Sequence, residues 1–113
     1  DCWTLVRDWY KENLDVVLKD WDRPRTPTDF LQNPLFESLS AEAGFRELRT
    51  EEGFEKGDVL LMSMMYPGLN HVGVYIPQQK VLHHCAGRLS TEDLLDEWLL
   101  KCTGKRDRYA PQS

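Results

Sequence analysis

Between Asp1 and about Lys19, apolar residues recur at three- and four-residue intervals, the spacing of one face of an α-helix. Asp1 is a residue type favoured just before a helix, so the pattern predicts a helix with Cys2 in its first turn. The stripe that would face the core consists of Val6, Trp9, Tyr10, Leu14, Val17 and Leu18.

A loop and a second helix are predicted before the first strand. Residues 20–29 contain two prolines and many turn formers, which is typical of a loop. Residues 34–43 favour a helix, with Pro34 tolerated in the first turn and Gly44 just past the end.

Five later stretches have the composition of β-strands. Residues 45–49 alternate and predict an edge strand, whereas residues 59–64 are continuously apolar and predict a strand buried on both faces. Residues 71–76 and 80–85 flank a short turn and predict a hairpin. Residues 105–110 predict a last short strand.

A helix is predicted from Ser90 onward, because Ser90-x-x-Asp93 resembles a capping box and an apolar helical pattern follows. Its acidic residues would form a solvated face, namely Glu92, Asp93, Asp96 and Glu97. The predicted fold class is α+β, with the helices packed on one side of a small antiparallel sheet.

Length and charge limit the classes of function. The 113 residues form one predicted domain, residues 1–113, and the missing initiator Met leads us to expect further residues before Asp1. A net charge of −5 argues against nucleic-acid binding, and no apolar run is long enough to span a bilayer. The three cysteines are an odd number and include no Cys-x-x-Cys pair, so we expect three reduced thiols, one of them reactive; the alternative is one disulfide and one free thiol.

All three histidines fall on the predicted hairpin. Side chains alternate along a strand, so His71 and His83 would share a face and His84 would point away. A turn centred on Pro77 would place His71 directly opposite His83, with Cβ atoms about 4.5–5.5 Å apart. A four-residue loop would pair His71 with His84 instead.

Two adjacent imidazoles can serve as a general base and the residue that orients it, and Cys2 is a suitable nucleophile beside them. The first turn of a helix presents free N–H groups and the positive end of the helix dipole, which predicts a lowered thiol pKa and an oxyanion site. The structural alternatives are a buried cysteine and satisfied histidines. A zinc site of His71, His83, His84 and Cys85 is disfavoured, because neighbouring strand residues point to opposite faces.

The segments "DCWTLV", "KGDVLLM" and "NHVGVYI", with a histidine twelve positions after His71, resemble the NlpC-type cell-wall cysteine peptidases. The resemblance covers nearly the whole chain and is strongest to the phage tail-assembly branch. It implies a papain-like fold without a cofactor or metal, with Cys2 as nucleophile, His71 as base and His83 as orienting residue. Trp3-Thr4 departs from the Ser-Gly that many members have after the cysteine.

The same resemblance implies hydrolysis of amide bonds in peptidoglycan stem peptides, as a component of a phage or prophage tail. The implied partners are these peptides and phage tail proteins, in the virion tail or the host cytoplasm during assembly, with action at the cell wall or periplasm. Trp3, Tyr75 and Arg88 are candidate substrate contacts. The alternatives are a catalytically silent tail-tip assembly module and a thiol acyltransferase or amidase.

Overall fold

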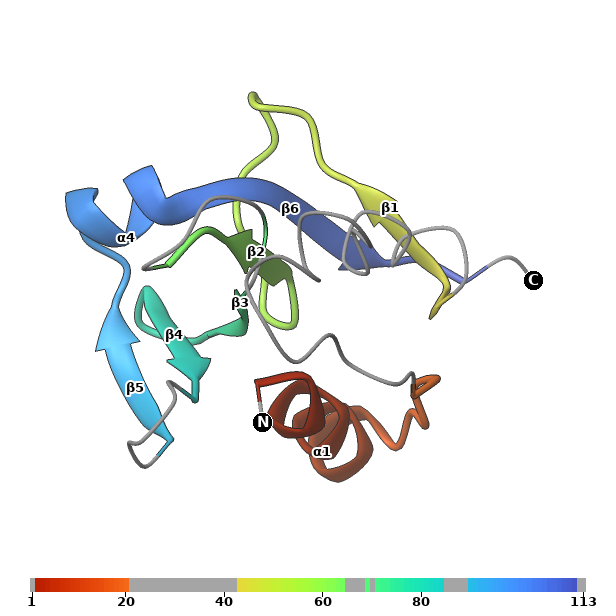
Figure 1. The fold of residues 1–113 in the computed structure, drawn as a ribbon. Coiled ribbons are helices and arrows are strands. Elements are labelled where there is room, and N and C mark those ends of the chain that lie inside the picture. Colours follow the sequence, from red (N-terminus) through yellow and green to blue (C-terminus); the bar gives the residue numbers. More distant parts are fainter. Residues whose placement is uncertain (1, 21–42, 65–68, 70, 85–89, 112–113) are drawn as a thin grey trace.

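The computed structural model describes residues 2–20, 43–64, 69, 71–84 and 90–111. In chain order the elements are α1 (Cys2–Leu14), β1 (Phe45–Glu47), β2 (Val59–Met62), β3 (His71–Ile76), β4 (Lys80–His83), β5 (Thr91–Leu94), α4 (Glu97–Cys102) and β6 (Thr103–Tyr109) (Figure 1). The fold is α+β, as the sequence predicts. The predicted helix at residues 34–43, apart from Ala43, and the predicted loop at residues 20–29, apart from Asp20, lie outside the described residues. No helix in the described ranges has the length and apolarity to cross a membrane.

One antiparallel sheet of six strands organises the molecule, in the order β1-β6-β2-β3-β4-β5. β1 is at one edge, as predicted, and β5 is at the other. β6 comes last in the sequence but lies between β1 and β2, where it pairs with both. β2 occupies the centre, and all four of its residues are buried, which confirms the prediction from its continuous apolar run.

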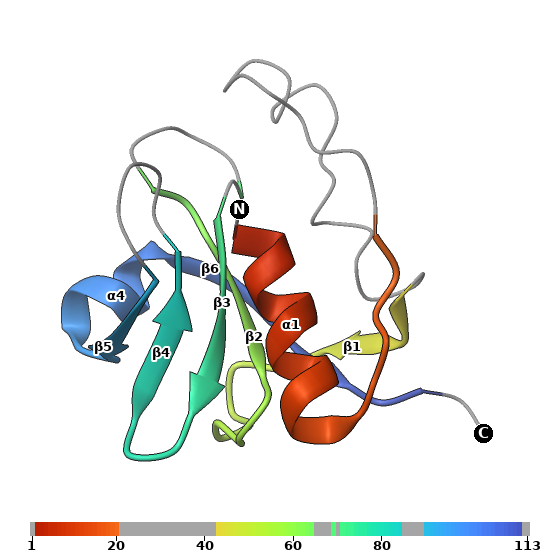
Figure 2. The same ribbon diagram turned by 90° about the horizontal axis from the view of Figure 1, so that it is seen from below.

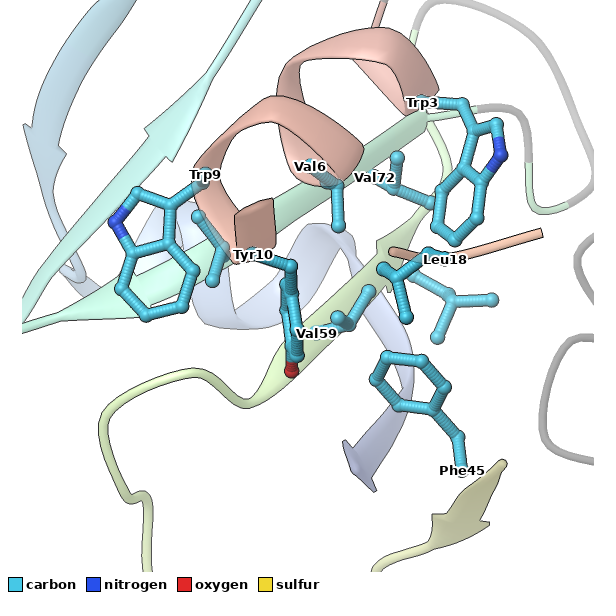
Figure 3. Close-up of a cluster of buried hydrophobic side chains, with 10 residues drawn as sticks. Trp3, Val6, Trp9, Tyr10, Leu18, Phe45, Val59 and Val72 are labelled. Atoms are coloured by element: carbon cyan, nitrogen blue, oxygen red, sulfur yellow. The ribbon is translucent and has the colours of Figure 1, made fainter. Parts of the chain in front are cut away.

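Helix α1 covers one face of the sheet (Figure 2). Its apolar stripe packs on alternate residues of β2 and β3, and Tyr10 also donates a hydrogen bond from its hydroxyl to the Gly57 carbonyl. The helix ends at Leu14 rather than near Lys19, because Asp15 has a left-handed φ of 54°. The core on this face comprises Trp3, Val6, Trp9, Tyr10, Leu18, Phe45, Val59, Leu61, Val72 and Val74 (Figure 3).

Helix α4 covers the opposite face, which corrects the prediction that the helices pack on one side. Leu99 of α4 packs on Leu60, Met62 and Val81, the strand residues that point away from α1. Because side chains alternate along β2, one four-residue strand contributes to both cores.

The region predicted as one helix from Ser90 is a strand followed by a shorter helix. β5 pairs with β4, with Lys80 opposite Leu94 and His83 opposite Thr91. The helical pattern applies only after Asp96, whose carboxylate accepts the Leu99 N–H as the N-cap of α4. Pairing with β4 has therefore overridden the local capping signal.

The hairpin of β3 and β4 has the predicted strands but a different register. Gly73 lies opposite His83, and Ile76 lies opposite Lys80. The turn therefore comprises residues 77–79, whereas the prediction centred it on Pro77. Gln78 and Gln79 adopt positive φ values of 71° and 57° in this turn. The shift of two residues preserves the faces of the strands, since the side-chain period is two.

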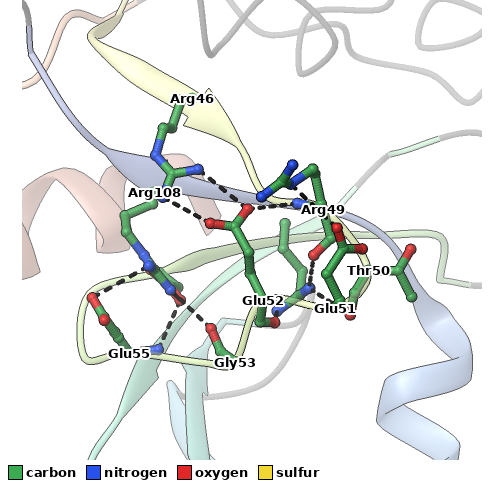
Figure 4. Close-up of polar contacts among 10 residues, drawn as sticks. Arg46, Arg49, Thr50, Glu51, Glu52, Gly53, Glu55 and Arg108 are labelled. Atoms are coloured by element: carbon green, nitrogen blue, oxygen red, sulfur yellow. Dashed lines mark hydrogen bonds and ion pairs between the residues drawn. The ribbon is translucent and has the colours of Figure 1, made fainter.

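A polar network ties the loop between β1 and β2 to β6 (Figure 4). Arg108 donates from Nε and Nη2 to the two carboxylate oxygens of Asp58, at 2.8 and 3.0 Å. Arg46 makes a similar double contact with Glu52 at the surface. Charged hydrogen bonds thus fix the loop to the sheet, in addition to the packing of Phe54 against the core.

Candidate active site

His71 and His83 are in direct contact. The Nε2 atom of His71 lies 2.8 Å from Nδ1 of His83, and the ring planes are inclined by 73°. Both side chains are buried, with residue exposures of 7 and 3%. The sequence expectation that these two residues share a face agrees with this geometry, although neither is directly opposite the other.

Gly73 makes the diagonal contact possible. It lies opposite His83 and two residues from His71, on the same face of β3. A Cβ atom at Gly73 would lie 2.6 Å from Val81 Cγ1 and 3.1 Å from His83 Cβ. The absent side chain therefore leaves the space in which the His83 ring reaches His71.

His84 does not take part in this contact. Its Nδ1 atom lies 3.2 Å from the Ser90 hydroxyl. The register of the hairpin, with Gly73 opposite His83, removes the alternative in which His71 pairs with His84.

Cys2 begins α1 at the end of the helix nearest the start of β3. The backbone N–H of Val72, the residue after His71, is directed at the Cys2 sulfur. Cys2 packs with the core on the α1 side, whereas His71 and His83 stand on the other pleat of the hairpin. The sulfur and the imidazole pair thus approach the first residues of β3 from two sides.

The protonation state of Cys2 differs from the thiolate that the sequence predicts. Burial raises the pKa of the Cys2 thiol, and the N–H groups of Val72 and Trp3 only partly oppose this effect. Burial, together with the charges of His83 and His84, lowers the pKa of His71 to about 4. A neutral imidazole beside a protonated thiol is therefore the expected resting state at neutral pH.

A carboxylate that the sequence analysis assigned to a solvated helix face extends the histidine pair. Asp93 Oδ2 lies 2.6 Å from His83 Nε2 and accepts a hydrogen bond from the Thr91 hydroxyl at 3.0 Å. Asp93 was missed because its position beside His83 depends on the pairing of β5 with β4, for which the local sequence carries no strand signal.

The structure does not bring Trp3 or Tyr75 to this site. Trp3 is fully buried and its indole N–H donates to the Lys19 carbonyl, so its ring does not face a substrate groove. Tyr75 lies four residues along β3 from His71 and stacks on Phe54. Arg88 and Cys85 are outside the described residues. Among the described side chains, no group of three or more histidine, cysteine or acidic residues is arranged to hold a metal ion.

Comparison with known proteins gives two findings. A model of the NlpC/P60 family matches residues 1–105. Tail tip assembly protein K of Escherichia phage N15 is 29% identical over 92 residues, which cover 80% of this chain and 37% of the phage protein. The match thus spans well under half of the length of that relative.

Proposed function

Because the chain belongs to the NlpC/P60 family, we propose that it is a cysteine peptidase that hydrolyses amide bonds in peptidoglycan stem peptides. The observation that supports this most strongly is the buried His71–His83 pair at 2.8 Å, with the sulfur of Cys2 at the N–H of the next residue, Val72. A nucleophile, a base and a residue that orients the base are the parts that a thiol acyl-transfer site needs.

In the proposed reaction His71 acts as a general base on a neutral thiol. Its Nε2 atom is engaged by His83, so Nδ1 is the nitrogen that accepts the Cys2 proton. The sulfur attacks the amide carbonyl carbon as the proton leaves, and the N–H groups at the start of α1 stabilise the resulting oxyanion. The lowered pKa keeps the His71 imidazole in its free, proton-accepting form at neutral pH, and it also makes the ring a weaker base than an ordinary histidine.

The remaining steps return the enzyme to its starting state. The tetrahedral intermediate collapses as His71 gives its proton to the leaving amine, and an acyl thioester on Cys2 remains. His71 then takes a proton from water as the water oxygen attacks the thioester carbonyl carbon. The second tetrahedral intermediate collapses with cleavage of the C–S bond, and His71 returns its proton to the Cys2 sulfur. The products are an amine, a carboxylic acid and the free thiol.

The phage relative supports a tail context for this activity. That protein is named for tail tip assembly, and we propose that the present domain acts in a phage or prophage tail, with tail proteins as partners. The site of action is the cell wall that the tail must pass. The assignment of stem peptides as the substrate is based on family membership.

The test is digestion of purified muropeptides, followed by mass spectrometry of the products. We expect cleaved stem peptides from the native protein and none from Cys2→Ser. Cys102→Ser is the matched control, since Cys102 is also a half-buried free thiol but lies in α4 across the sheet. Equal cleavage by native protein and Cys2→Ser, or no cleavage by either, would contradict the proposal.

The second candidate is a catalytically silent module that contributes to tail assembly. The name of the phage relative, a tail tip assembly protein, favours it. Under this alternative, phage that carry Cys2→Ser would assemble and infect normally. If the domain is instead a peptidase at the tail tip, the same phage should fail to infect host cells whose walls are intact.

A further inference from the structure

The histidine pair does not end at His83, because β5 brings a carboxylate to the second ring nitrogen. Asp93 lies on the edge strand, diagonal to His83 across the β4–β5 pair. Its Oδ2 atom contacts His83 Nε2 at 2.6 Å and holds the Thr91 hydroxyl at 3.0 Å. The side chain of Asp93 is 54% exposed and that of His83 is 3% exposed, so a solvated carboxylate contacts a buried ring.

This contact determines which atoms carry protons along the whole chain of hydrogen bonds. An ionised carboxylate only accepts, so the hydrogen of neutral His83 must be on Nε2. Its Nδ1 atom then only accepts, and His71 must donate from Nε2. The lone pair of His71 is consequently on Nδ1, the atom that has to take the thiol proton.

The opposite arrangement would disable the base. With the hydrogen of His83 on Nδ1, the ring would donate to His71 Nε2, and the hydrogen of His71 would move to Nδ1. That tautomer cannot accept a proton from Cys2. The two arrangements make the same number of bonds between the rings, so only the group at His83 Nε2 distinguishes them.

We propose that Asp93 is a positioning residue that sets the direction of the His71–His83 hydrogen bond and keeps His71 in the tautomer with a free Nδ1 lone pair. The catalytic part of this inference rests on the proposed peptidase function, but the tautomer part does not. Asp93 touches neither sulfur nor substrate and acts only through His83.

The direct test is nitrogen-15 NMR of the imidazole rings in the full chain at neutral pH. We expect the Nε2–H tautomer for both His71 and His83 in the native protein. Asp93→Asn has the same shape but can also donate, so a fraction of His71 should change to the Nδ1–H tautomer. Glu92→Gln is the matched control, because it removes the same charge from the same strand at an exposed position opposite Leu82.

Turnover of muropeptides gives a second readout. Asp93→Asn should lower kcat about 10- to 100-fold, the range seen when a partner behind a functional histidine is removed, with KM changed less than about two-fold. Added formate should restore part of kcat to Asp93→Ala, since the exposed site admits a small carboxylate, and should not affect the native protein. A purely structural role of Asp93 would not give formate rescue.

Unchanged histidine tautomers in Asp93→Asn would overturn the proposal, whatever the activity. Unchanged kcat relative to Glu92→Gln in an active enzyme would also overturn it. If the native protein cleaves no muropeptide, the proposed function fails, and the NMR result still decides whether Asp93 sets the direction of the His71–His83 hydrogen bond.

Discussion

At the scale of single residues, His71 combines deep burial with a neighbouring histidine, and both disfavour its charged form. Its pKa is lowered from 6.5 to about 4. Above pH 6.5 the ring is neutral in both the folded and the unfolded chain, so its full contribution to stability is present. As the pH falls from 6.5 to about 4 the unfolded chain binds a proton that the folded chain excludes, and stability is lost.

We therefore expect the free energy of unfolding to drop by about 3 kcal/mol over this interval through His71 alone, at about 1.4 kcal/mol for each pKa unit. The measurement is urea denaturation at several pH values between 7.5 and 4. His71→Gln should show a correspondingly shallower pH dependence. His84→Gln should change the pH dependence of the unfolding free energy far less than His71→Gln, since the charge of His84 is the smallest of the three causes that lower the His71 pKa. Identical slopes for all three proteins would refute the assignment.

At the scale of elements, the β3–β4 hairpin shows what a local pattern can and cannot predict. β-Branched residues and alternation predict both strands and the shared face of His71 and His83, because these follow from side-chain period alone. The register depends on the turn, and the positive φ of Gln78 and Gln79 has no signal in those residue types. β5 was likewise not predictable, because its acidic sequence forms a strand only through pairing with β4.

The hairpin also gives a prediction, because a side chain at Gly73 would collide with Val81 and crowd His83. Gly73→Ala should destabilise the protein by about 1–3 kcal/mol, the usual cost of overpacking, and should break the His71–His83 contact. Urea denaturation and muropeptide turnover measure the two effects. Gly53→Ala is the control, since nothing lies within 4 Å of a Cβ placed there. Equal stability of the two variants would show that the hairpin accommodates the methyl group.

At the scale of the whole molecule, segments distant in sequence are joined by charge as well as by apolar packing. Asp58 is fully buried and precedes β2, and its carboxylate is held by Arg108 of β6 and by the Glu55 N–H. Arg46 makes a comparable double contact with Glu52, but both residues lie at the surface. Burial, not the number of bonds, separates the two pairs.

Arg108→Met should therefore cost about 3 kcal/mol, because it leaves a buried carboxylate without its cation. Arg46→Met should shift the unfolding midpoint far less, since exposed pairs contribute little. Thermal and urea unfolding provide the comparison. The double variant Asp58→Leu with Arg108→Met should recover much of the loss, and a double variant as unstable as Arg108→Met would contradict this explanation.

The class of fold, the central buried strand and the first helix were predictable because each follows from a periodicity within one segment. The placement of helices on both faces of the sheet was not predictable, because it depends on which side of β2 the residues near Leu99 reach. The candidate triad came from residue types at familiar spacing. Asp93 and the protonation states came only from three-dimensional neighbours.

The central position of β6 has a consequence for biosynthesis. β1 and β2 are separated in the sheet by the strand that is translated after all the others. Until that strand leaves the ribosome, β1 has no partner in this sheet and β2 has an unpaired edge. The domain must therefore complete its fold after translation of residue 109, and a nascent chain displays the Cys2 thiol before it has a finished scaffold.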